Sequence, residues 1–260
     1  MKRILLIELF LFSVILTLSA QYTTLNAHSH NDYANEIPFW LAFRNHFGSI
    51  EADIWAIDGE LLVAHYKADT KPELTLDSLY IQPIVRTFRQ NKGRAWADDP
   101  ATFQLLIDLK TEVNLTLPLL IEKLSQYPDV FNPGKNKGAV HIVISGNRPD
   151  PSQFNFYPRF IYFDGLLNLN YNKKQLKRIP LYSENLKKFT AWNGTGDIPE
   201  KDKIRLQSVI DSIHAINKKI RFWNAPDDIG PWDTFMTMGI DYLNTDHIVK
   251  LADYLNNSSR

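Results

Sequence analysis

Residues 49–65 read SIEADIWAIDGELLVAH, and this stretch carries the pattern that decides the fold. Residues 49–55 form an apolar, β-branched run that contains two acids, Glu51 and Asp53. Successive side chains on a strand point to opposite faces, so these two acids share one face. Residues 61–65 form a second run, LLVAH, which ends in His65. The stretch therefore predicts two strands that carry acids and a histidine toward one place.

The rest of the chain alternates between short apolar runs and amphipathic stretches of about ten to fifteen residues, which favours βα units and a parallel sheet. The other expected strands are residues 22–27, 103–109, 139–145, 160–163, 220–223 and 242–245. The expected helices are residues 38–46, 76–90, 115–126, 200–217, 231–238 and 248–256. Eight strand segments without a G-x-G-x-x-G turn suit a barrel better than a Rossmann sheet. We expect a distorted TIM-type (β/α)8 barrel in a single domain.

The composition excludes several classes of protein. The chain has 260 residues, of which 44% are hydrophobic and 22% charged, as expected for one globular domain. Its 29 basic and 29 acidic residues give no net charge, so no global field attracts nucleic acid or an anionic membrane. It has no cysteine, which excludes disulfides and thiolate chemistry.

The first twenty residues have the layout of a secretory signal peptide. Lys2 and Arg3 precede an apolar run over residues 4–18, and Ser19 and Ala20 follow it. The run is shorter than a membrane span and is interrupted by polar residues, which disfavours an uncleaved anchor helix. We therefore expect cleavage after Ala20, a barrel domain over residues 21–260, no stable membrane span, and export to the periplasm or the extracellular space.

Polar residues close several of the apolar runs, where barrel enzymes place their chemistry. Glu51 and Asp53 would repel each other inside a strand unless a cation or a basic partner neutralises them. A basic partner or a solvated strand end is the simpler explanation for the pair alone. Added to Asn31 and Asp108, however, the acids form a set of oxygen ligands that suits one Mg²⁺ or Ca²⁺ better than zinc.

Two histidines flank these acids in the expected fold. His30 follows the first strand and His65 ends the third, and imidazoles on either side of a bound anion suit general acid and general base roles. His46, His141, His214 and His247 are more simply explained as structural residues. We therefore expect His30 and His65 to form an acid-base pair.

At this point the motifs resemble those of a known superfamily. Residues 29–33, SHNDY, resemble the SHNTY stretch of phosphatidylinositol-specific phospholipase C, and residues 50–65 resemble its acidic strand and second catalytic histidine. The same stretch is similar to glycerophosphodiester phosphodiesterases, as is GIDYLNTDHI at 239–248. IDLKTE at 107–112 resembles a segment of the sphingomyelinase D branch. The phrases AHSHNDY and SIEADIW are most similar to the altered-inheritance-of-mitochondria protein type and its uncharacterised bacterial relatives.

This resemblance implies a TIM-type barrel and a role for each residue that matches a motif. It makes His30 and His65 the acid-base pair. His28 is the alternative first histidine, because in families with an H-R-G motif the residue at this position, directly after Ala27, is the catalytic one, although the H-R-G itself is missing here. It makes Lys110 a phosphate contact and Trp223 a pocket wall. The metal set is Asn31, Glu51, Asp53 and Asp108, to which Asp32 could add. Asp108 replaces the Glu usual in phospholipase C, which leaves Mg²⁺ and Ca²⁺ both open.

The expected activity is the hydrolysis of a phosphodiester, either a small molecule or a phospholipid head group. A neighbouring hydroxyl would attack the phosphorus, and Lys110 and Arg148 would bind phosphate oxygens. Two alternatives remain at this stage. The His28-Ser29-His30 motif also introduces amidohydrolase-like metal hydrolases, and the six tryptophans would suit a non-catalytic exported barrel that binds a lipid or glycan. The sequence does not indicate an oligomeric state.

Overall fold

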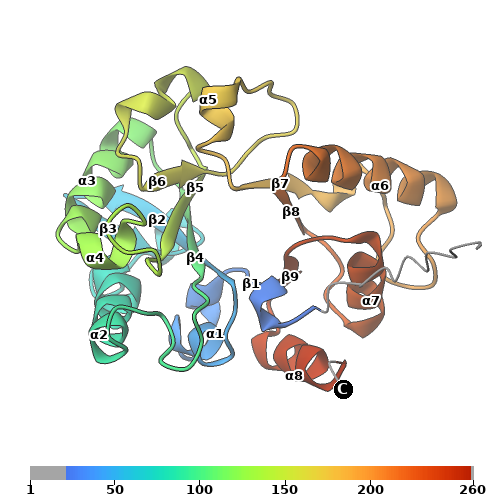
Figure 1. Ribbon diagram of the computed structural model, residues 1–260, viewed down its shortest axis with the longest axis horizontal. Helices are drawn as coiled ribbons and strands as arrows, with labels where there is room; N and C mark the ends of the chain where they lie inside the picture. Colours follow the sequence, from blue (N-terminus) through green and yellow to red (C-terminus); the bar gives the residue numbers. More distant parts are fainter. Residues whose placement is uncertain (1–21, 259–260) are drawn as a thin grey trace, which may run out of the picture.

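Eight short parallel strands form the centre of the molecule, and helices surround them (Figure 1). The computed structural model describes residues 22–258. The strands are β1 (Ala27–Ser29), β2 (Ser49–Ile57), β4 (Gln104–Leu109), β5 (His141–Gly146), β6 (Ile161–Phe163), β7 (Leu181–Asn185), β8 (Lys219–Trp223) and β9 (Leu243–Thr245). The helices are α1 (Trp40–Arg44), α2 (Gln82–Gln90), α3 (Val113–Ser125), α4 (Pro128–Phe131), α5 (Lys173–Leu176), α6 (Glu200–Ala215), α7 (Ile229–Met238) and α8 (Ile248–Ser258).

The parallel strands follow one another around a distorted barrel. One sheet has the strand order β6-β5-β4-β2-β1-β9, and β7 pairs with β8 in a second sheet. Single parallel bridges join the two sheets, from Gly165 to Tyr182 at one seam and from Arg221 to Tyr242 at the other. A Cβ at Gly165 would lie 2.7 Å from the Tyr182 ring, so the first seam requires a glycine. The expected parallel α/β fold of the TIM-barrel type is confirmed, with these seams as its distortion.

One of the eight strands expected from the sequence does not belong to the barrel. β3 (Glu60–Val63), which lies in the run LLVAH, pairs antiparallel with β2 and forms a hairpin around the Asp58-Gly59 turn. Asp58 and Gly59 both have positive φ, as tight hairpin turns require. The eighth barrel strand is instead β7, which the sequence reading missed because Ser183, Glu184 and Asn185 break its apolar run.

The prediction of a strand over residues 22–27 was also wrong in its extent. Thr23 and Asn26 form a reciprocal capping box, which folds Thr24–Asn26 into a 3-10 helix, η1, and leaves only Ala27–Ser29 as β1. The other short helical elements are η2 (Asp32–Ala34), η3 (Lys67–Asp69), η5 (Pro151–Phe156) and η6 (Leu186–Lys188), with a π-helical turn, η4 (Asp77–Ile81), before α2.

Successive side chains of a strand point to opposite faces of the sheet, so one face packs in the main core and the other lies beneath the cavity described below. Odd-numbered neighbours in β4, such as Leu105 and Ile107, belong to the large apolar cluster shared with the helices. The other face contributes a second, small cluster of Leu106, Val143, Leu181 and Tyr242. Two residues further along the chain from each of these lie the polar strand-end residues Asp108, Ser145, Ser183 and Asn244. The site therefore rests on an apolar layer, since side chains two apart share a face.

The expected signal peptide, residues 1–20, lies outside the described residues. Within residues 22–258, no helix is both long enough and apolar enough to cross a membrane.

Candidate active site

A cavity of about 600 Å³ opens at the carboxyl ends of the barrel strands. Its volume is in the range that small-molecule sites occupy. Most of the residues predicted from the sequence line it, and His28 and Asp32 do not. The lining comprises His30, Asn31, Glu51, Asp53, His65, Asp108, Lys110, Ser145, Gly146, Arg148, Asp164, Leu166, Ser183, Glu184, Lys188, Arg221, Trp223 and Asn224.

Three carboxylates meet on one side of this cavity. Glu51 and Asp53 come from β2, and Asp108 comes from β4, where it pairs in register with Asp53. One oxygen from each of the three lies within 4.8 Å of the others. Glu51 and Asp53 are buried, whereas Asp108 is partly exposed to the cavity. The i, i+2 spacing in β2 thus places both acids on the same face, as the sequence predicted.

Basic side chains contact some of the carboxylate oxygens but leave one buried oxygen without a partner. Lys110 Nζ lies 2.9 Å from Asp53 Oδ2 and 3.4 Å from Asp108 Oδ1. Asp53 Oδ2 also accepts from His65 Nδ1 at 3.0 Å. Its other oxygen, Oδ1, is buried and has no hydrogen-bond partner among the described residues. A buried acceptor without a partner is rare, and a bound cation would satisfy it.

The electrostatics of the three acids differ. Burial alone would raise the pKa of Glu51, but Arg221 and His28 hold it well below its usual range. Burial raises the pKa of Asp108, and the neighbouring charges of Asp53 and Glu51 add to this although Lys110 opposes it. A cation nearby would favour the ionised form of Asp108.

A glycine makes room for Asp108 at the end of β5. Gly146 has a φ of +66°, and a Cβ at this position would lie 2.2 Å from Asp108 Oδ1 and 2.6 Å from the Leu109 carbonyl oxygen. No side chain fits at this distance. The carboxylate of Asp108 therefore lies where the Cβ of any residue other than glycine at position 146 would be.

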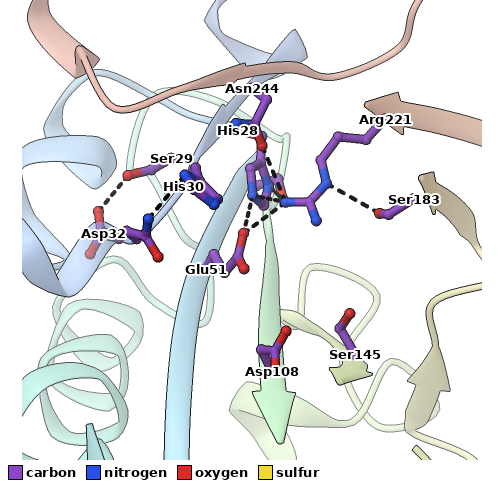
Figure 2. A network of polar contacts seen from close by, with 12 residues as sticks. His28, Ser29, His30, Asp32, Glu51, Asp108, Ser145, Ser183, Arg221 and Asn244 are labelled. Carbon is purple, nitrogen blue, oxygen red and sulfur yellow. Dashed lines mark hydrogen bonds and ion pairs between the residues drawn. The ribbon is translucent and has the colours of Figure 1, made fainter. Parts of the chain in front are cut away.

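His28 lies behind the acids and not in the cavity. Its ring is fully buried between Ser49 Oγ, 2.6 Å from Nδ1, and Glu51 Oε2, 2.7 Å from Nε2. Arg221 contacts the same Nε2 and Glu51, and Figure 2 shows the three side chains converging. Burial and the charge of Arg221 lower the pKa of His28 to about 3, so the ring stays neutral. His28 and Arg221 together fix the orientation of Glu51.

His30 and His65 line the cavity. His30 Nδ1 donates to Asp246 Oδ1 at 2.8 Å, which fixes the tautomer of the ring. Burial lowers the pKa of His30, but the carboxylates of Asp246 and Glu51 more than offset this and raise it overall. His65 Nδ1 donates to Asp53, and its ring packs against Tyr66 in a T-shaped arrangement, with centroids 4.5 Å apart. Both rings thus have one nitrogen held by an acid.

The described residues do not support the metal arrangement of an amidohydrolase. The acidic cluster that could hold an ion contains no histidine. His28 and His30 also have separate partners, Glu51 and Asp246. The H-x-H motif therefore does not form a chelate.

The turn after β1 positions Asn31, with a tyrosine that the sequence reading missed. Asn31 adopts the left-handed conformation, with φ 46°, which asparagine tolerates. The hydroxyl of Tyr33 lies 2.7 Å from both Asn31 Oδ1 and Asp53 Oδ2 and can donate to one of them at a time. Tyr33 therefore links the turn to the acidic cluster.

The suggestion that Asp32 joins the metal set was wrong. Asp32 points away from the cavity and accepts from Ser29 Oγ at 2.8 Å, Phe39 N at 2.6 Å and Tyr80 Oη at 2.9 Å. Figure 2 shows it on the far side of Ser29 from Glu51. Its side chain is fully buried, and burial raises its pKa to about 6. Asp32 thus fixes the turn that carries His30 and Asn31.

The opposite wall of the cavity comes from β5 to β8. Arg148 and Trp223, both predicted from the sequence, lie here. Asp164, Glu184 and Arg221 also line this wall and were not predicted. Arg221 could have been found from its sequence context, because it is a charged residue in the apolar run KIRFW and lies two positions from Trp223.

Comparison with known proteins shows similarity to one family of phosphodiesterase domains. A family model described as "AIM6-like phosphodiesterase domain" matches residues 16–164. Altered inheritance of mitochondria protein 6 of Saccharomyces cerevisiae is 29% identical over 253 residues, which cover 82% of this chain and 65% of that protein. The same-named protein of Eremothecium gossypii is 26% identical, and the match covers 87% of this chain and 68% of that protein.

Two solved structures resemble the fold. A glycerophosphodiester phosphodiesterase from Parabacteroides distasonis has a TM-score of 0.56 at 12% identity, and the match covers 90% of this chain and 98% of that one. A phosphodiesterase from Oleispira antarctica, solved in complex with the product sn-glycerol-3-phosphate, has a TM-score of 0.51 at 10% identity, covering 88% and 95%. At such low identities, the likeness is one of fold alone.

Proposed function

The chain belongs to the family of AIM6-like phosphodiesterase domains, and we propose that it is a metal-dependent phosphoric diester hydrolase with His30 and His65 as its acid-base pair. One observation gives the strongest support for this proposal. A cluster of three carboxylates, with the buried Asp53 Oδ1 lacking a partner, shares a single cavity with two histidines. A phosphoryl group bound over the cluster would have an imidazole within the same cavity to take a proton and another to give one.

The donor set fits a hard divalent cation. Asn31, Glu51, Asp53 and Asp108 would hold it through oxygen atoms, as Mg²⁺ or Ca²⁺ prefers. When bound, such a cation would stabilise the negative charge that develops on the phosphate oxygens. Lys110 and Arg221 hold the carboxylates in place by ion pairs. This support from basic residues keeps the acids close together in spite of their mutual repulsion.

The chain's own residues account for the proton transfers. A hydroxyl of the substrate, next to the phosphoester, attacks phosphorus and loses its proton to one histidine. The bond from phosphorus to the leaving alcohol breaks, and the second histidine protonates the departing oxygen. The product is a cyclic phosphate, which water opens by the reverse sequence of proton transfers. Each proton transfer is expected to contribute roughly 10²- to 10⁴-fold to the rate.

Lys110 and Arg148 would bind phosphate oxygens, and Trp223 would wall the pocket. All three line the cavity. The substrate would be a phosphodiester of a small alcohol or a phospholipid head group. The sn-glycerol-3-phosphate in the Oleispira antarctica phosphodiesterase supports a small phosphate ester as product. Because the chain matches only 65% of the length of the Saccharomyces cerevisiae relative, activity and substrate of the whole protein are part of this proposal.

Export of the protein is a separate part of the proposal. It rests on the composition of residues 1–20, with a basic start, an apolar run and small residues at the end. Secretion of the mature chain, beginning at Gln21, by the native host would support it. Retention of the intact chain inside the cell would contradict it.

The function is tested with the p-nitrophenyl ester of glycerol phosphate, which has a neighbouring hydroxyl and a coloured leaving group. With Mg²⁺ or Ca²⁺ present, loss of the histidine that takes the hydroxyl proton, by His30→Ala or by His65→Ala, should lower kcat by about 10²- to 10⁴-fold, with a much smaller change in KM. Loss of the other histidine should have a smaller effect on this ester, because p-nitrophenolate leaves without being protonated. His214→Ala is the matched control, because His214 is exposed and pairs with Asp241 away from the cavity. Equal rates for wild type, both histidine variants and the control would refute the assignment.

A further inference from the structure

Charge is unevenly distributed over the molecule, although the chain has no net charge. The segments that lead into β5, β6, β7 and β8 are residues 126–140, 157–160, 177–180 and 216–219. Together they hold seven basic residues, which are Lys135, Lys137, Arg159, Lys177, Arg178, Lys218 and Lys219. Their one acid is Asp129, which is exposed and lies outside the cavity. This imbalance places a positive field at the amino ends of these strands, opposite to the cavity.

The four segments lie side by side. Arg178 is buried and donates to the carbonyl oxygens of Pro158 at 2.8 Å and Ile161 at 2.6 Å, which ties the segment before β7 to the one before β6. Lys219 N donates to Pro180 O at 3.3 Å, which ties in the segment before β8. The parallel pairing of β5 with β6 brings the first segment beside the second. The basic residues therefore share one surface.

Six of the seven basic side chains on this surface have no acidic partner. Among the described residues, no carboxylate forms an ion pair with any of Lys135, Lys137, Arg159, Lys177, Lys218 and Lys219. All of them are exposed except Lys218, which is partly exposed. We call these six residues the basic face. Like charges that gather without counter-charges repel one another, so an anion at this face would stabilise them.

The neighbours of Lys219 leave its charge available. Lys219 Nζ donates to the Tyr242 hydroxyl at 3.0 Å and lies 4.5 Å from the centroid of that ring. His141, the first residue of β5, is near enough that the charge of Lys219, after burial, lowers its pKa. Asp241, in the segment before β9, pairs with His214 at 2.8 Å and not with Lys219. The centre of the basic face is thus positive.

The kind of side chain on the basic face favours a lipid surface over a nucleic acid. All but Arg159 are lysines, which act as point charges toward a diffuse layer of phosphates, whereas recognition of nucleic acids favours the forked guanidinium of arginine. Single-stranded nucleic acids also require exposed aromatic rings on which bases stack. On this face Tyr242 is only 5% exposed, and Phe160 and Tyr162 are partly buried.

Apolar groups accompany the lysines, as expected for contact with lipid. Ile216, 40% exposed, lies two positions before Lys218. A largely apolar hollow of about 210 Å³ opens beside Arg159, and it is lined by Leu124, Ser125, Pro128, Phe131, Asn132 and Phe160. Basic side chains with apolar surface between them are typical of proteins that bind at the interface of an anionic bilayer.

We propose that the basic face docks the protein on an anionic lipid bilayer, with its lysines over the phosphate head groups. Each Lys or Arg near such a surface adds to the binding. Parallel strands place their amino and carboxyl ends on opposite sides of the barrel, so the docked protein keeps its cavity open to the aqueous phase. The inference goes beyond the proposed function and does not require that the protein cleave a diester.

Co-sedimentation with lipid vesicles tests the inference. The chain from Gln21, which contains the whole described barrel, is treated with a chelator so that no bound cation contributes to binding. It is mixed with vesicles of phosphatidylcholine alone or with about one third phosphatidylglycerol, at about 0.1 M NaCl. We expect a partition coefficient at least about tenfold larger for the anionic vesicles. It should fall toward the value for neutral vesicles at about 0.5 M NaCl, because salt screens the attraction.

Two double variants remove charge from separate segments of the basic face. Lys218→Gln/Lys219→Gln and Lys135→Gln/Lys137→Gln should each lower the partition coefficient for anionic vesicles by about 5- to 30-fold. Having both guards the test against a local folding defect in either segment. Lys218→Arg/Lys219→Arg keeps the charge and should partition like wild type.

The matched control is Lys67→Gln/Lys71→Gln. Both lysines are exposed, form no ion pair among the described residues, and follow the cavity-lining His65. The control should therefore partition like wild type, because it removes the same charge at the other end of the barrel.

Several results would overturn the inference. They are equal partition of wild type to both kinds of vesicle, binding that salt does not weaken, and wild-type partition of both basic-face double variants. A loss of binding in the control alone would place the contact at the mouth of the cavity. Tighter binding of a single-stranded DNA oligonucleotide than of anionic vesicles, compared per phosphate, would assign the face to nucleic acid and refute the lipid partner.

Discussion

His28 and His30 are two positions apart in the sequence and have opposite environments. His28 is enclosed by Ser49, Glu51 and Arg221, which keep it neutral, whereas His30 lines the cavity and pairs with Asp246. The difference follows from the geometry at the end of β1, where the chain leaves the strand and turns at Asn31. At the residue scale, therefore, one histidine orients a carboxylate and the other is available to the substrate.

The neutral state of His28 predicts a pH dependence of stability. Its folded-state pKa of about 3 lies below the unfolded value of 6.5, so protons bind the unfolded chain more strongly. The stabilisation is complete above pH 6.5 and is lost as the pH falls toward 3. In chelator-treated protein, this group should lower the free energy of unfolding by about 2 kcal/mol between pH 7 and pH 5.

Urea unfolding of wild type and His28→Gln at both pH values measures this contribution. The variant should lack that part of the pH dependence, while His214→Gln, at an exposed position, should keep it. The same change in unfolding free energy from pH 7 to pH 5 in wild type and His28→Gln would contradict the buried, neutral state.

Most residues on the acidic side of the cavity were predictable from the sequence, and those on the opposite wall were less so. Glu51 and Asp53 stand out because charged residues in an apolar strand require a reason. Asp164 closes the apolar run 160–163 and so carries the strand-end signal, but it was not picked out. Tyr33 has no such signal, since it lies in the short turn after β1, where polar residues are common. Its importance comes from partners that are distant in the sequence.

At the scale of elements, the end of β5 gives the sharpest prediction. Gly146→Ala would bring a Cβ to within 2.2 Å of Asp108 Oδ1, so the carboxylate must move. We expect the affinity for Mg²⁺ or Ca²⁺ to fall by about 10- to 100-fold, the usual cost of displacing a metal ligand's support. Gly59→Ala is the control, because Gly59 has a φ of +82° but has no atom within 4 Å of an added Cβ.

Both variants should lose about 1 kcal/mol of stability from the left-handed backbone. Gly146→Ala should lose more, because its Cβ also lies 2.6 Å from the Leu109 carbonyl oxygen, and only this variant should lose cation affinity. Calorimetric titration with each cation, together with thermal unfolding, separates the two effects. Equal cation affinity in Gly146→Ala and Gly59→Ala would show that Asp108 does not take part in cation binding.

The elements also show where pattern reading fails. The more apolar segment, β3, was expected to be a barrel strand, but it forms a hairpin with β2. The more polar segment, β7, was not expected to be a strand, but it is one of the barrel strands and pairs with β8. β3 follows a two-residue turn with positive φ at both positions, and this geometry returns the chain antiparallel. Ser183 and Glu184 lie at the end of β7 that lines the cavity. These polar residues interrupt the apolar pattern by which a strand is recognised in the sequence.

At the scale of the whole molecule, the barrel brings together two walls with different properties. Residues from β1, β2 and β4 supply acids and histidines, and residues from β5 to β8 supply paired charges, hydroxyls and an exposed tryptophan. The alternation of βα units predicted this architecture, because parallel strands place their carboxyl ends on one side. The seams at Gly165 and Arg221, held by single bridges, could not be predicted, because they depend on how the two sheets meet.

The central claim is that the acidic cluster holds one divalent cation on which diester cleavage depends. The most direct measurement is the rate of cleavage of the p-nitrophenyl ester by chelator-stripped protein, titrated with Mg²⁺ and with Ca²⁺, in wild type, Asp53→Asn and the control Asp129→Asn. We predict no cleavage without cation, saturable recovery in wild type and control, and at least about tenfold more cation for half-recovery in Asp53→Asn. Full activity in the stripped protein, or the same midpoint in Asp53→Asn, would contradict the claim.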